Sequence, residues 1–486
     1  MFLGIDLGTS EVKLLLLDSA GQIVGQAGAS LEVSRPQALW AEQAPQDWWL
    51  ATESAVAQLR AAHPGQFAQV RAIGLSGQMH GAVLLDAQDE VLRPAILWND
   101  GRSYAECGEL TERAPNLHAV AGNLAMPGFT APKLLWVRKH EPAVFAQVRC
   151  VLLPKDYLRL LLSGEKVSDP SDAAGTLWLD VAARDWSDEL LAACHLSRAQ
   201  MPRLVESNQP SARLRPEVAK AWGLGADVVI AGGAGDNAAS AIGIGAVAPG
   251  DGFISLGTSG VLFVVNDRYR PNPKSAVHAF CHALPQRWHQ MSVMLSAASC
   301  LKWFVQLSGA ADESALLSEV AALPAASLLN APIFLPYLAG ERTPHNDPFA
   351  QALFFGLNHQ STRALCAYAV LEGVAFGLAD GLAALQASGT EVTRLSLVGG
   401  GARSSLWAQL IADALGVEIV VHRGGEAGGA LGAARLGWLA AGGSEAVVCT
   451  KPDVAARHLP HPQRHAHLRQ RLQRFREIYQ RLKTLS

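Results

Sequence analysis

Short apolar runs separated by polar turns open the chain and predict β-strands. Residues 2–5 are apolar and β-prone, a polar turn follows at residues 7–10, and residues 12–17 are apolar again before another turn and a third strand-like run. Runs of this kind, bounded by turn-forming residues, are typical of strands. The N-terminal segment is therefore expected to form strand, tight loop, strand and strand.

Several longer segments predict helices instead. They are residues 47–62, 130–140, 153–164 and 364–385, together with a C-terminal segment that carries Leu468, Leu472, Phe475, Ile478 and Leu482 on one face. Residues 105–225 are expected to be mostly helical. The run of small residues at 424–443 is expected to form a helix packed tightly in the core. Strands and helices together indicate an α/β protein.

A second copy of the N-terminal pattern occurs in the other half of the chain. G-F-I-S-L-G-T-S-G-V-L-F-V-V-N-D at residues 252–267 repeats G-I-D-L-G-T-S-E-V-K-L-L-L-L-D at residues 4–18. One such loop in each half suggests two related domains that face each other across a cleft, with the phosphates of a nucleotide between them. Gly and Pro are dense within residues 243–252, so the domains are predicted at residues 1–245 and 246–486.

Length and composition agree with two globular domains. A chain of 486 residues exceeds what one hydrophobic core usually supports, and 49% hydrophobic residues argue against long disordered tails. The net charge of -3 gives no basic surface for nucleic acid. The seven Cys are scattered, the N-terminus lacks a signal-peptide core, and no run is long and charge-free enough to span a bilayer. A cytoplasmic protein that binds neither nucleic acid nor membrane is expected.

The first repeated loop has chemistry suited to phosphate and a divalent cation. It offers a glycine for close backbone approach, two hydroxyls, a carboxylate and a nearby lysine, which are Gly8, Thr9, Ser10, Asp6 and Lys13. The second copy has Ser255 where the first has Asp6, so only the first loop can offer a carboxylate to Mg²⁺. The alternative, for one loop taken alone, is an ordinary hairpin turn.

Two glycines bracket three side chains in G-Q-M-H-G at residues 77–81, after a predicted strand. A loop at a strand end commonly contacts a ligand. Gln78 and His80 could bond sugar hydroxyls while Met79 lies against carbon atoms. The alternative for His80 is a structural histidine with its hydrogen bonds satisfied inside the protein.

A third glycine-containing segment, V-I-A-G-G-A-G-D-N-A-A-S-A-I-G-I-G at residues 229–245, places Asp236 in a small and apolar run. A carboxylate there must be paired, hydrogen-bonded or shifted in pKa, as functional carboxylates often are. The alternative is that Asp236 or Asn237 caps the helix that follows. These two interpretations are equally supported by this stretch alone.

Gly399, Gly400 and Gly401 lie between a predicted strand and a predicted helix. Backbone amides and a helix N-terminus in this arrangement can face a nucleotide. The position of the three glycines after the second L-G-T-S loop makes them candidates for the adenosine side of the site.

Other charged residues are expected to be structural. Asp169, Asp172 and Asp180 miss the spacing of a calcium loop and are interpreted as loop and cap residues. Glu341 and Arg342 can pair with each other. Glu372, on the buried face of the helix at residues 364–385, is expected to have a structural role.

Motifs spread over essentially the whole chain, taken together and in order, resemble those of the FGGY carbohydrate kinases. They are D-L-G-T-S-E-V-K from residue 6, S-G-Q-M-H-G from 76, L-R-P-A-I-L-W-N-D-G-R from 92, N-L-A-M-P-G-F-T-A-P-K-L-L-W from 123, L-L-P-K-D-Y-L-R-L from 152, G-D-N-A-A from 235, S-L-G-T-S-G from 255, F-L-P-Y-L-A-G-E-R-T-P-H from 334 and G-G-G-A-R-S from 399. The resemblance implies an α/β fold of two actin-like (ribonuclease H-like) ATPase domains that face each other across a catalytic cleft.

The resemblance also implies phosphoryl transfer from MgATP to a sugar hydroxyl, here the 5-hydroxyl of D-xylulose, in D-xylose catabolism. Asp236 matches the general base, and Asp6 would hold Mg²⁺ directly or through water. The sugar site would contain Met79, His80, Asp236 and Asn237, with Gln78 as a weaker candidate. The residues that would face the nucleotide are Gly8, Thr9, Ser10, Lys13, Gly257, Thr258, Gly399, Gly400 and Gly401.

Two alternatives stay open at this point. Within the family, the substrate could be another pentulose or polyol, such as ribulose or glycerol, although the Q-M-H-G match favours xylulose. Outside enzymes, a sugar-responsive actin-fold protein without turnover would be marked by loss of Asp236 or by a DNA-binding extension, and neither is seen. The sequence does not specify the oligomeric state and leaves a homodimer open.

Overall fold

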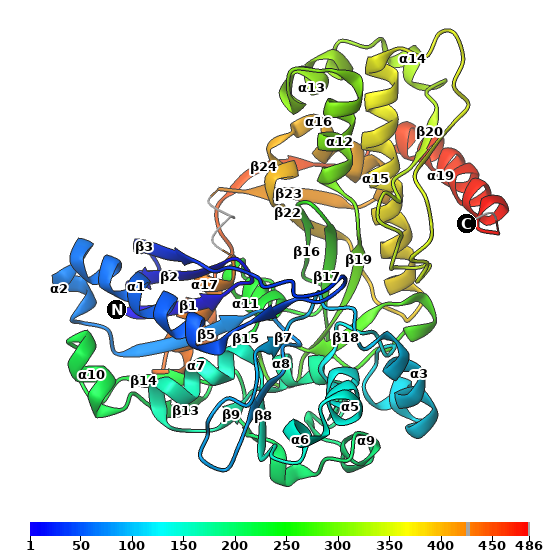
Figure 1. Ribbon diagram of the computed structural model, residues 1–486. Helices are drawn as coiled ribbons and strands as arrows, with labels where there is room; N and C mark the ends of the chain where they lie inside the picture. The colour runs from blue at the N-terminus through cyan, green and yellow to red at the C-terminus, as the bar shows by residue number, and fades with distance from the viewer. Residues whose placement is uncertain (424–427, 485–486) are drawn as a thin grey trace.

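The computed structural model describes residues 1–423 and 428–484 and contains a large sheet in each half of the chain (Figure 1). The first sheet has the order β13-β14-β5-β1-β2-β3, and β15 also pairs with β5. β1 runs antiparallel to β2 and parallel to β5, which confirms the predicted strands at the N-terminus. The strands are β1 (Phe2–Leu7), β2 (Glu11–Leu17), β3 (Ile23–Ser30), β5 (Ala72–Gly77), β13 (Pro210–Arg213), β14 (Val229–Ala231) and β15 (Ala234–Gly235).

The second sheet repeats the hairpin and parallel neighbour of the first. Its order is β18-β19-β17-β16-β22-β23-β24. β16 runs antiparallel to β17 and parallel to β22, as β1 does with β2 and β5. The duplication predicted from the two L-G-T-S loops is therefore also a duplication of topology. The strands are β16 (Gly252–Leu256), β17 (Gly260–Asn266), β18 (His278–Cys281), β19 (Trp288–Met294), β22 (Arg394–Val398), β23 (Glu418–His422) and β24 (Val454–His458).

Helices pack on both faces of the first sheet. α1 (Pro45–Ala62) and α7 (Pro154–Ser163) share a core with Leu3 and Ile5, whereas α11 (Asp236–Gly243) and α17 (Gly428–Ala440) lie on the side of Phe2 and Gly4. α17 belongs to the second half of the sequence but packs on the first sheet, and a Cβ on Gly4 would lie 2.0 Å from the carbonyl oxygen of Ala430. Of the helix predicted at 424–443, residues 424–427 lie outside the described residues.

The second sheet is covered by α15 (Arg363–Gln386) and α16 (Ser405–Leu415), with α12 (Ala298–Ser308) and α19 (Pro462–Leu482) nearby. α15 corrects the expectation that no run is long and apolar enough to span a bilayer. Among the described residues it is the helix that meets this test, but 89% of its apolar window is buried inside the protein. The structural role predicted for Glu372 on this helix is confirmed, because it pairs with Arg471 of α19 at 2.6 Å.

The region expected to be mostly helical is in fact mixed. It contains α3 (Tyr104–Arg113) and α5 (Thr130–His140), but short strands interrupt it at β8 (Cys150–Leu152), β9 (Val167–Ser168), β10 (Leu179–Asp180) and β11 (Asp185–Trp186). These strands are too short to show a periodic pattern in the sequence. Phe129, just before α5, shares a core with Phe280 of β18, so this region joins the two halves.

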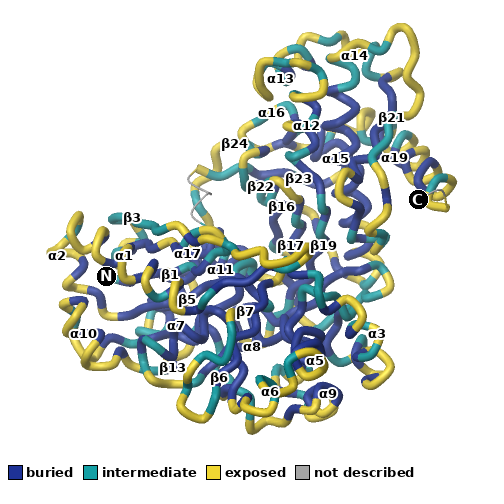
Figure 2. The backbone as a smooth tube through the Cα atoms, viewed as in Figure 1, coloured by how far each residue is buried: buried dark blue, intermediate teal, exposed yellow. Residues whose placement is uncertain are grey.

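Further short α-helices and strands occur in the described part of the chain. The helices are α2 (Pro64–Phe67), α4 (Leu117–Val120), α6 (Pro142–Phe145), α8 (Pro170–Ala173), α9 (Asp188–Ala193), α10 (Pro216–Trp222), α13 (Glu313–Ala321), α14 (Ala325–Leu328) and α18 (Glu445–Val448), and the strands are β4 (Glu42–Gln43), β6 (Val83–Leu85), β7 (Ala95–Ile96), β12 (Arg203–Leu204), β20 (Ile333–Leu335) and β21 (Leu353–Phe355). Figure 2 shows the central strands of both sheets buried and the outer helix α2 mostly exposed.

Candidate active site

Three neighbouring strands of the first sheet end at the same place and bring two carboxylates to one edge. Asp6 in β1 is in register with Ser76 of β5, and Ala234 of β15 is in register with the same serine from the other side. Gly235 follows, and Asp236 is the first residue of α11. Ligands of open α/β sheets bind at the carboxyl ends of the strands. This edge is therefore the candidate active site.

Asp236 is a half-buried carboxylate with few partners. Its Oδ1 accepts hydrogen bonds from the main-chain N–H of Asn237 at 2.7 Å and from the side-chain amide of the same residue at 2.9 Å. Burial, and then the negative charge of Asp6, raises the pKa of Asp236 to about 6. At neutral pH the carboxylate is thus ionised and still basic enough to accept a proton.

The alternative role of Asp236 or Asn237 as a helix cap is wrong. Gly235 occupies the cap position of α11, and no side chain accepts a capping hydrogen bond there. The glycines before Asp236 also make room for protein atoms, because a Cβ on Gly235 would lie 2.9 Å from the sulfur of Met79. The small residues of this stretch thus bring Asp236 close to a candidate sugar-binding side chain.

Asp6 fits a role as a metal ligand. Its Oδ1 is buried and has no hydrogen-bond partner among the described residues, and burial raises the pKa of the group. The carboxylate lies against Gly429 of α17, where a Cβ would come within 2.7 Å of Oδ1. Within residues 1–423 and 428–484, no group of three or more His, Cys, Asp or Glu could hold a metal. Asp6 therefore suits a cation that keeps water and phosphate oxygens as ligands, as Mg²⁺ does.

The first repeated loop joins β1 to β2, and side chains from neighbouring segments form hydrogen bonds with it. The hydroxyl of Thr9 donates to Oε1 of Gln78 at 3.0 Å and accepts from the indole N–H of Trp98 at 2.9 Å. Ser10 is exposed, and the ammonium of Lys13 is also exposed, 3.5 Å from the carboxylate of Glu11. Gly8 forms the turn itself, as its N–H donates to the carbonyl of Glu11.

The candidate sugar loop follows β5. Gln78 is buried and links this loop to the first repeated loop through Thr9 and Gln43. Met79 is buried beside Gly235. His80 adopts a positive φ of 70°, which is uncommon for a residue with a side chain and is found often at functional sites.

His80 is uncharged at neutral pH. Burial is the main cause that lowers the pKa of His80 to about 3, and the nearby positive charges of Lys133 and Arg342 add to it. Its Nδ1 lies 2.7 Å from the carbonyl oxygen of Gly175 and so carries the proton of the neutral ring. The Nε2 atom is then an acceptor, which suits a sugar hydroxyl.

Sequence reasoning missed side chains that surround His80 from distant segments. The ring of Phe129 lies 4.5 Å from that of His80, and Phe280 and His278 of β18 stack on each other beside them. Nη1 of Arg342 lies 3.5 Å from Nε2 of His278. Phe129 and Arg342 lie within two of the quoted motifs, but a motif does not show which segments meet in the fold.

The expected pairing of Glu341 with Arg342 is not an ion pair between their side chains. Oε1 of Glu341 instead accepts from the main-chain N–H groups of Leu295 at 3.0 Å and Arg342 at 2.7 Å. Burial raises the pKa of Glu341 to about 8. Its role in the fold is therefore to hold the loop that brings Arg342 toward the candidate sugar site.

A cavity of about 380 Å³ brings the two halves of the candidate site together. Its lining includes Asn237 and Ser240 of α11, Ser255 of β16, and Gly399 and Gly400 after β22. It therefore joins the helix that starts at Asp236 to the glycines predicted to face a nucleotide. Its size is in the range of small-molecule sites.

The other residues predicted to face the nucleotide from the second half of the chain are Gly401, Gly257 and Thr258, and they differ in their surroundings. Gly401 is buried, and a Cβ there would lie 2.4 Å from the side chain of Leu256. The carbonyls of Gly257 and Thr258 accept hydrogen bonds from the main chain at the start of α12, namely from Ala298 at 2.8 Å and Ala297 at 2.9 Å. The second repeated loop is thus held by the start of α12, and the N–H of Gly257 donates to the carbonyl of Ser259 within the loop at 3.1 Å.

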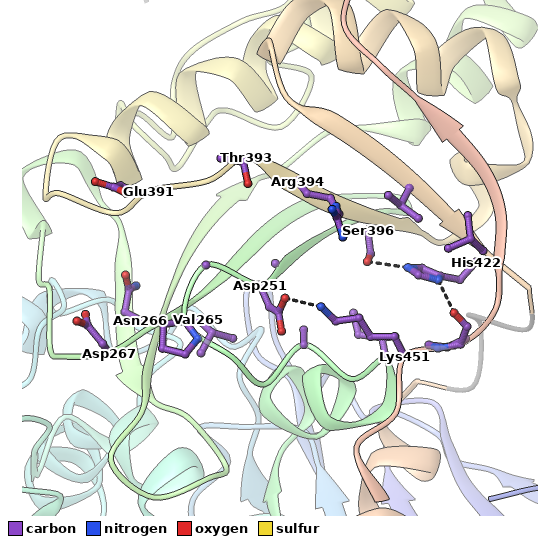
Figure 3. Close-up of a pocket in the computed structure, with 18 of the residues that line it drawn as sticks. Asp251, Val265, Asn266, Asp267, Glu391, Thr393, Arg394, Ser396, His422 and Lys451 are labelled. Carbon is purple, nitrogen blue, oxygen red and sulfur yellow. Dashed lines mark hydrogen bonds and ion pairs between the residues drawn. The ribbon is translucent and has the colours of Figure 1, made fainter. Parts of the chain in front are cut away.

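A larger cavity of about 780 Å³ shares the lining residue Ile244 with the smaller one (Figure 3). It is lined by the start of β16, the end of β17 and the first part of β22, and neither Asp6 nor Asp236 borders it. Lys451 pairs with Asp251 at 2.5 Å inside it, which ties together two segments where the chain passes between its halves. The larger cavity is therefore not the candidate active site, because it contains neither of the two carboxylates.

Comparison with known proteins agrees with this geometry. The N-terminal domain of the FGGY family of carbohydrate kinases matches residues 1–243, and the C-terminal domain of that family matches residues 252–441. A xylulose kinase of Escherichia coli (strain K12) is 54% identical over 99% of both chains.

Solved structures show the same likeness over the full length. A xyloylose kinase from Brucella ovis superposes with a TM-score of 0.96 at 52% identity and covers 100% of both chains. A xylulose kinase from Rhodospirillum rubrum superposes with a TM-score of 0.91 at 28% identity over 100% of this chain and 99% of that one. The chain therefore belongs to the FGGY family of carbohydrate kinases.

Proposed function

We propose that the protein transfers the terminal phosphoryl group of MgATP to the 5-hydroxyl of D-xylulose, giving D-xylulose 5-phosphate and ADP. The observation that carries the proposal is the position of Asp236, an ionised carboxylate between the Met79–His80 loop and the cavity that reaches Gly399 and Gly400. The relatives named xylulose kinase, at 52% and 54% identity over the whole chain, support the choice of sugar.

In this proposal, Asp236 accepts the proton of the attacking hydroxyl. Phosphoryl transfer depends mainly on positioning and on neutralising charge, so one carboxylate beside the hydroxyl suffices as a base. Met79, His80 and Asn237 hold the sugar, with the neutral His80 accepting from one of its hydroxyls. Gln78 supports them by joining the sugar loop to Thr9.

The nucleotide and the metal have their own proposed residues. The backbone of the two L-G-T-S loops would lie along the phosphates, and Gly399 and Gly400 would face the adenosine. Asp6 would hold Mg²⁺, directly or through water, and the cation would neutralise charge on the phosphates. The sugar-binding domain would comprise residues 1–245 and the nucleotide-binding domain residues 246–486. A cytoplasmic location would fit a kinase that acts on a sugar and MgATP. A homodimer would be compatible with this proposed function.

A panel of sugars tests the substrate. Initial rates with MgATP are compared for D-xylulose, D-ribulose, L-ribulose and glycerol at matched concentrations. The proposal expects the highest kcat/KM for D-xylulose. A clear preference for a ribulose or for glycerol would contradict the choice of sugar and leave the family assignment intact.

A further inference from the structure

A cluster of five charged side chains is completely buried beneath the segment that carries Asp236. Lys155, Asp156 and Arg159 come from α7, and Asp169 and Asp172 from the start of α8, all with 0% exposure. Nζ of Lys155 lies 2.7 Å from Asp156, 2.8 Å from Asp169 and 2.9 Å from Asp172. The sequence had suggested only loop and cap roles for the last two, and the cap role of Asp169 on α8 is confirmed.

Burying such a cluster costs free energy, so a contribution to stability does not explain why the protein contains it. Charges taken out of water lose their hydration, and buried ion pairs can often be replaced by apolar residues without loss of stability. Although burial alone would lower the pKa of Lys155, the three carboxylates together raise it, so the lysine is charged. Burial raises the pKa of Asp172, and the positive charge of Lys155 opposes this rise.

Arg159 of the cluster, and Ser171 next to it, form hydrogen bonds with the main chain just before Asp236. Nη1 of Arg159 donates to the carbonyl of Ala231 at 2.5 Å, and Nη2 donates to the carbonyl of Gly232 at 2.5 Å. The hydroxyl of Ser171 donates to Asp169 and accepts from the N–H of Gly235 at 3.3 Å. The residues on both sides of the turn into β15 are thus fixed by buried side chains.

The backbone of this turn is shaped to meet the cluster. Gly233 has a positive φ of 76°, and a Cβ there would lie 3.1 Å from Nη2 of Arg159. Gly77, at the end of the adjacent β5, would place a Cβ 3.1 Å from Cβ of Lys155. The close approach of α7 to both strand ends therefore depends on glycine at each point.

We propose that Lys155, Arg159, Asp169 and Ser171 are positioning residues that set the location of the Asp236 carboxylate through the main chain of residues 231–235. β15 is only two residues long, so it has little pairing of its own to fix its direction. In this proposal the buried side chains of the cluster hold the main chain of residues 231–235 in place instead. The inference rests on the proposed role of Asp236 as the base.

A positioning role differs from a structural one in which kinetic constant it changes. A base displaced by part of an ångström still allows both substrates to bind. The free-energy barrier of the phosphoryl-transfer step is then higher, because the base is no longer aligned with the hydroxyl. Loss of positioning should therefore lower kcat and leave KM for sugar and for ATP nearly unchanged. A general loss of stability would lower the melting temperature without this split.

Two serines provide a matched test. Ser171 and Ser207 both donate to Oδ2 of Asp169, at 2.5 and 2.8 Å, and both are completely buried, but only the Ser171 hydroxyl bonds the segment before Asp236. Ser171→Ala and Ser207→Ala should lose similar thermal stability. Ser171→Ala should lower kcat about tenfold at unchanged KM, whereas Ser207→Ala should keep kcat within about twofold of the parent protein.

Arg159→Lys gives an independent second arm. Lysine keeps the buried positive charge but lacks the planar fork that reaches two carbonyls. A lower kcat at unchanged KM is expected here as well. Equal kcat in the two serine variants, or an unchanged kcat in Arg159→Lys, would overturn the proposal. Failure of the base assignment itself would appear separately, as sugar-dependent turnover retained in Asp236→Ala.

Discussion

Asp6 lies in β1 and Asp236 directly follows β15, the two strands that pair with β5 at this edge, and the charge of Asp6 helps to raise the pKa of Asp236. Each carboxylate makes the ionised form of the other less favourable. A divalent cation at Asp6 would relieve this repulsion and leave Asp236 to accept a proton. The pair therefore separates into a metal-holding and a proton-accepting carboxylate in the proposed mechanism.

The pH dependence of turnover should report this pair. The pKa of Asp236 is raised to about 6, and the proposed base must be ionised. As pH falls through about 6, kcat/KM for the sugar should therefore decrease, approaching tenfold for each further pH unit. Initial rates between pH 5 and 8.5 measure this, with ATP binding followed over the same range as the control. A flat profile down to pH 5 would contradict the assignment.

Removing the charge at position 236 should abolish turnover and stabilise the fold. The pKa of Asp236 rises from 3.8 to about 6 on folding, so its ionised form opposes folding, fully above pH 6 and not at all below pH 4. Asp236→Asn should gain about 1–3 kcal/mol at pH 7.5, allowing for partial exposure to water, and lose this gain near pH 4. Urea unfolding at both pH values measures it.

Two further variants complete this test. Asp453→Asn removes an exposed carboxylate and should change neither stability nor turnover. Asp236→Ala should lose sugar-dependent turnover but keep ATP binding, because no nucleotide contact is proposed for that side chain. Sugar phosphorylation by Asp236→Ala at a near-normal rate would refute its role as base.

Much of the fold could be predicted because it is local. The β1–β2 hairpin and its copy at β16–β17 are strand, loop and strand over fewer than twenty residues, and their apolar runs and L-G-T-S loops are visible in the sequence. The isolation of Asp236 in an apolar run also marked it as a candidate for chemistry. Each of these features depends on residues that are close together along the chain.

What could not be predicted depends on segments that meet across the sequence. Nothing in the pattern of α17 indicates that it packs on β1, more than 400 residues earlier in the chain. Lys155 and Asp172 look like ordinary surface charges, since charged residues are rarely buried unless paired, and their pairing appears only when α7 and α8 meet. Arg342 was missed as a neighbour of His278 for the same reason.

Asp6→Asn should weaken the use of Mg²⁺ and also move the pH profile. Loss of a metal-holding carboxylate should raise the Mg²⁺ concentration needed for half-maximal rate by at least about tenfold. Loss of its charge should lower the pKa of Asp236, so the remaining activity should persist to lower pH than in the parent protein. Mg²⁺ titrations and pH profiles measure both, with Asp453→Asn as the control. An unchanged Mg²⁺ requirement would argue against Asp6 as the ligand.

A methyl group at Gly175 should weaken sugar binding selectively. A Cβ there would lie 2.6 Å from Nδ1 of His80 and 2.8 Å from Cε of Met79, so both side chains must move. Gly175→Ala should raise KM for D-xylulose about tenfold, equivalent to about 1.4 kcal/mol, and leave KM for ATP unchanged. Gly108→Ala is the matched control, because Gly108 lies within α3 with no atom within 4 Å of the added Cβ, and the variant should be slightly more stable. Equal KM values for D-xylulose in the two variants would show that Met79 and His80 do not define the sugar site.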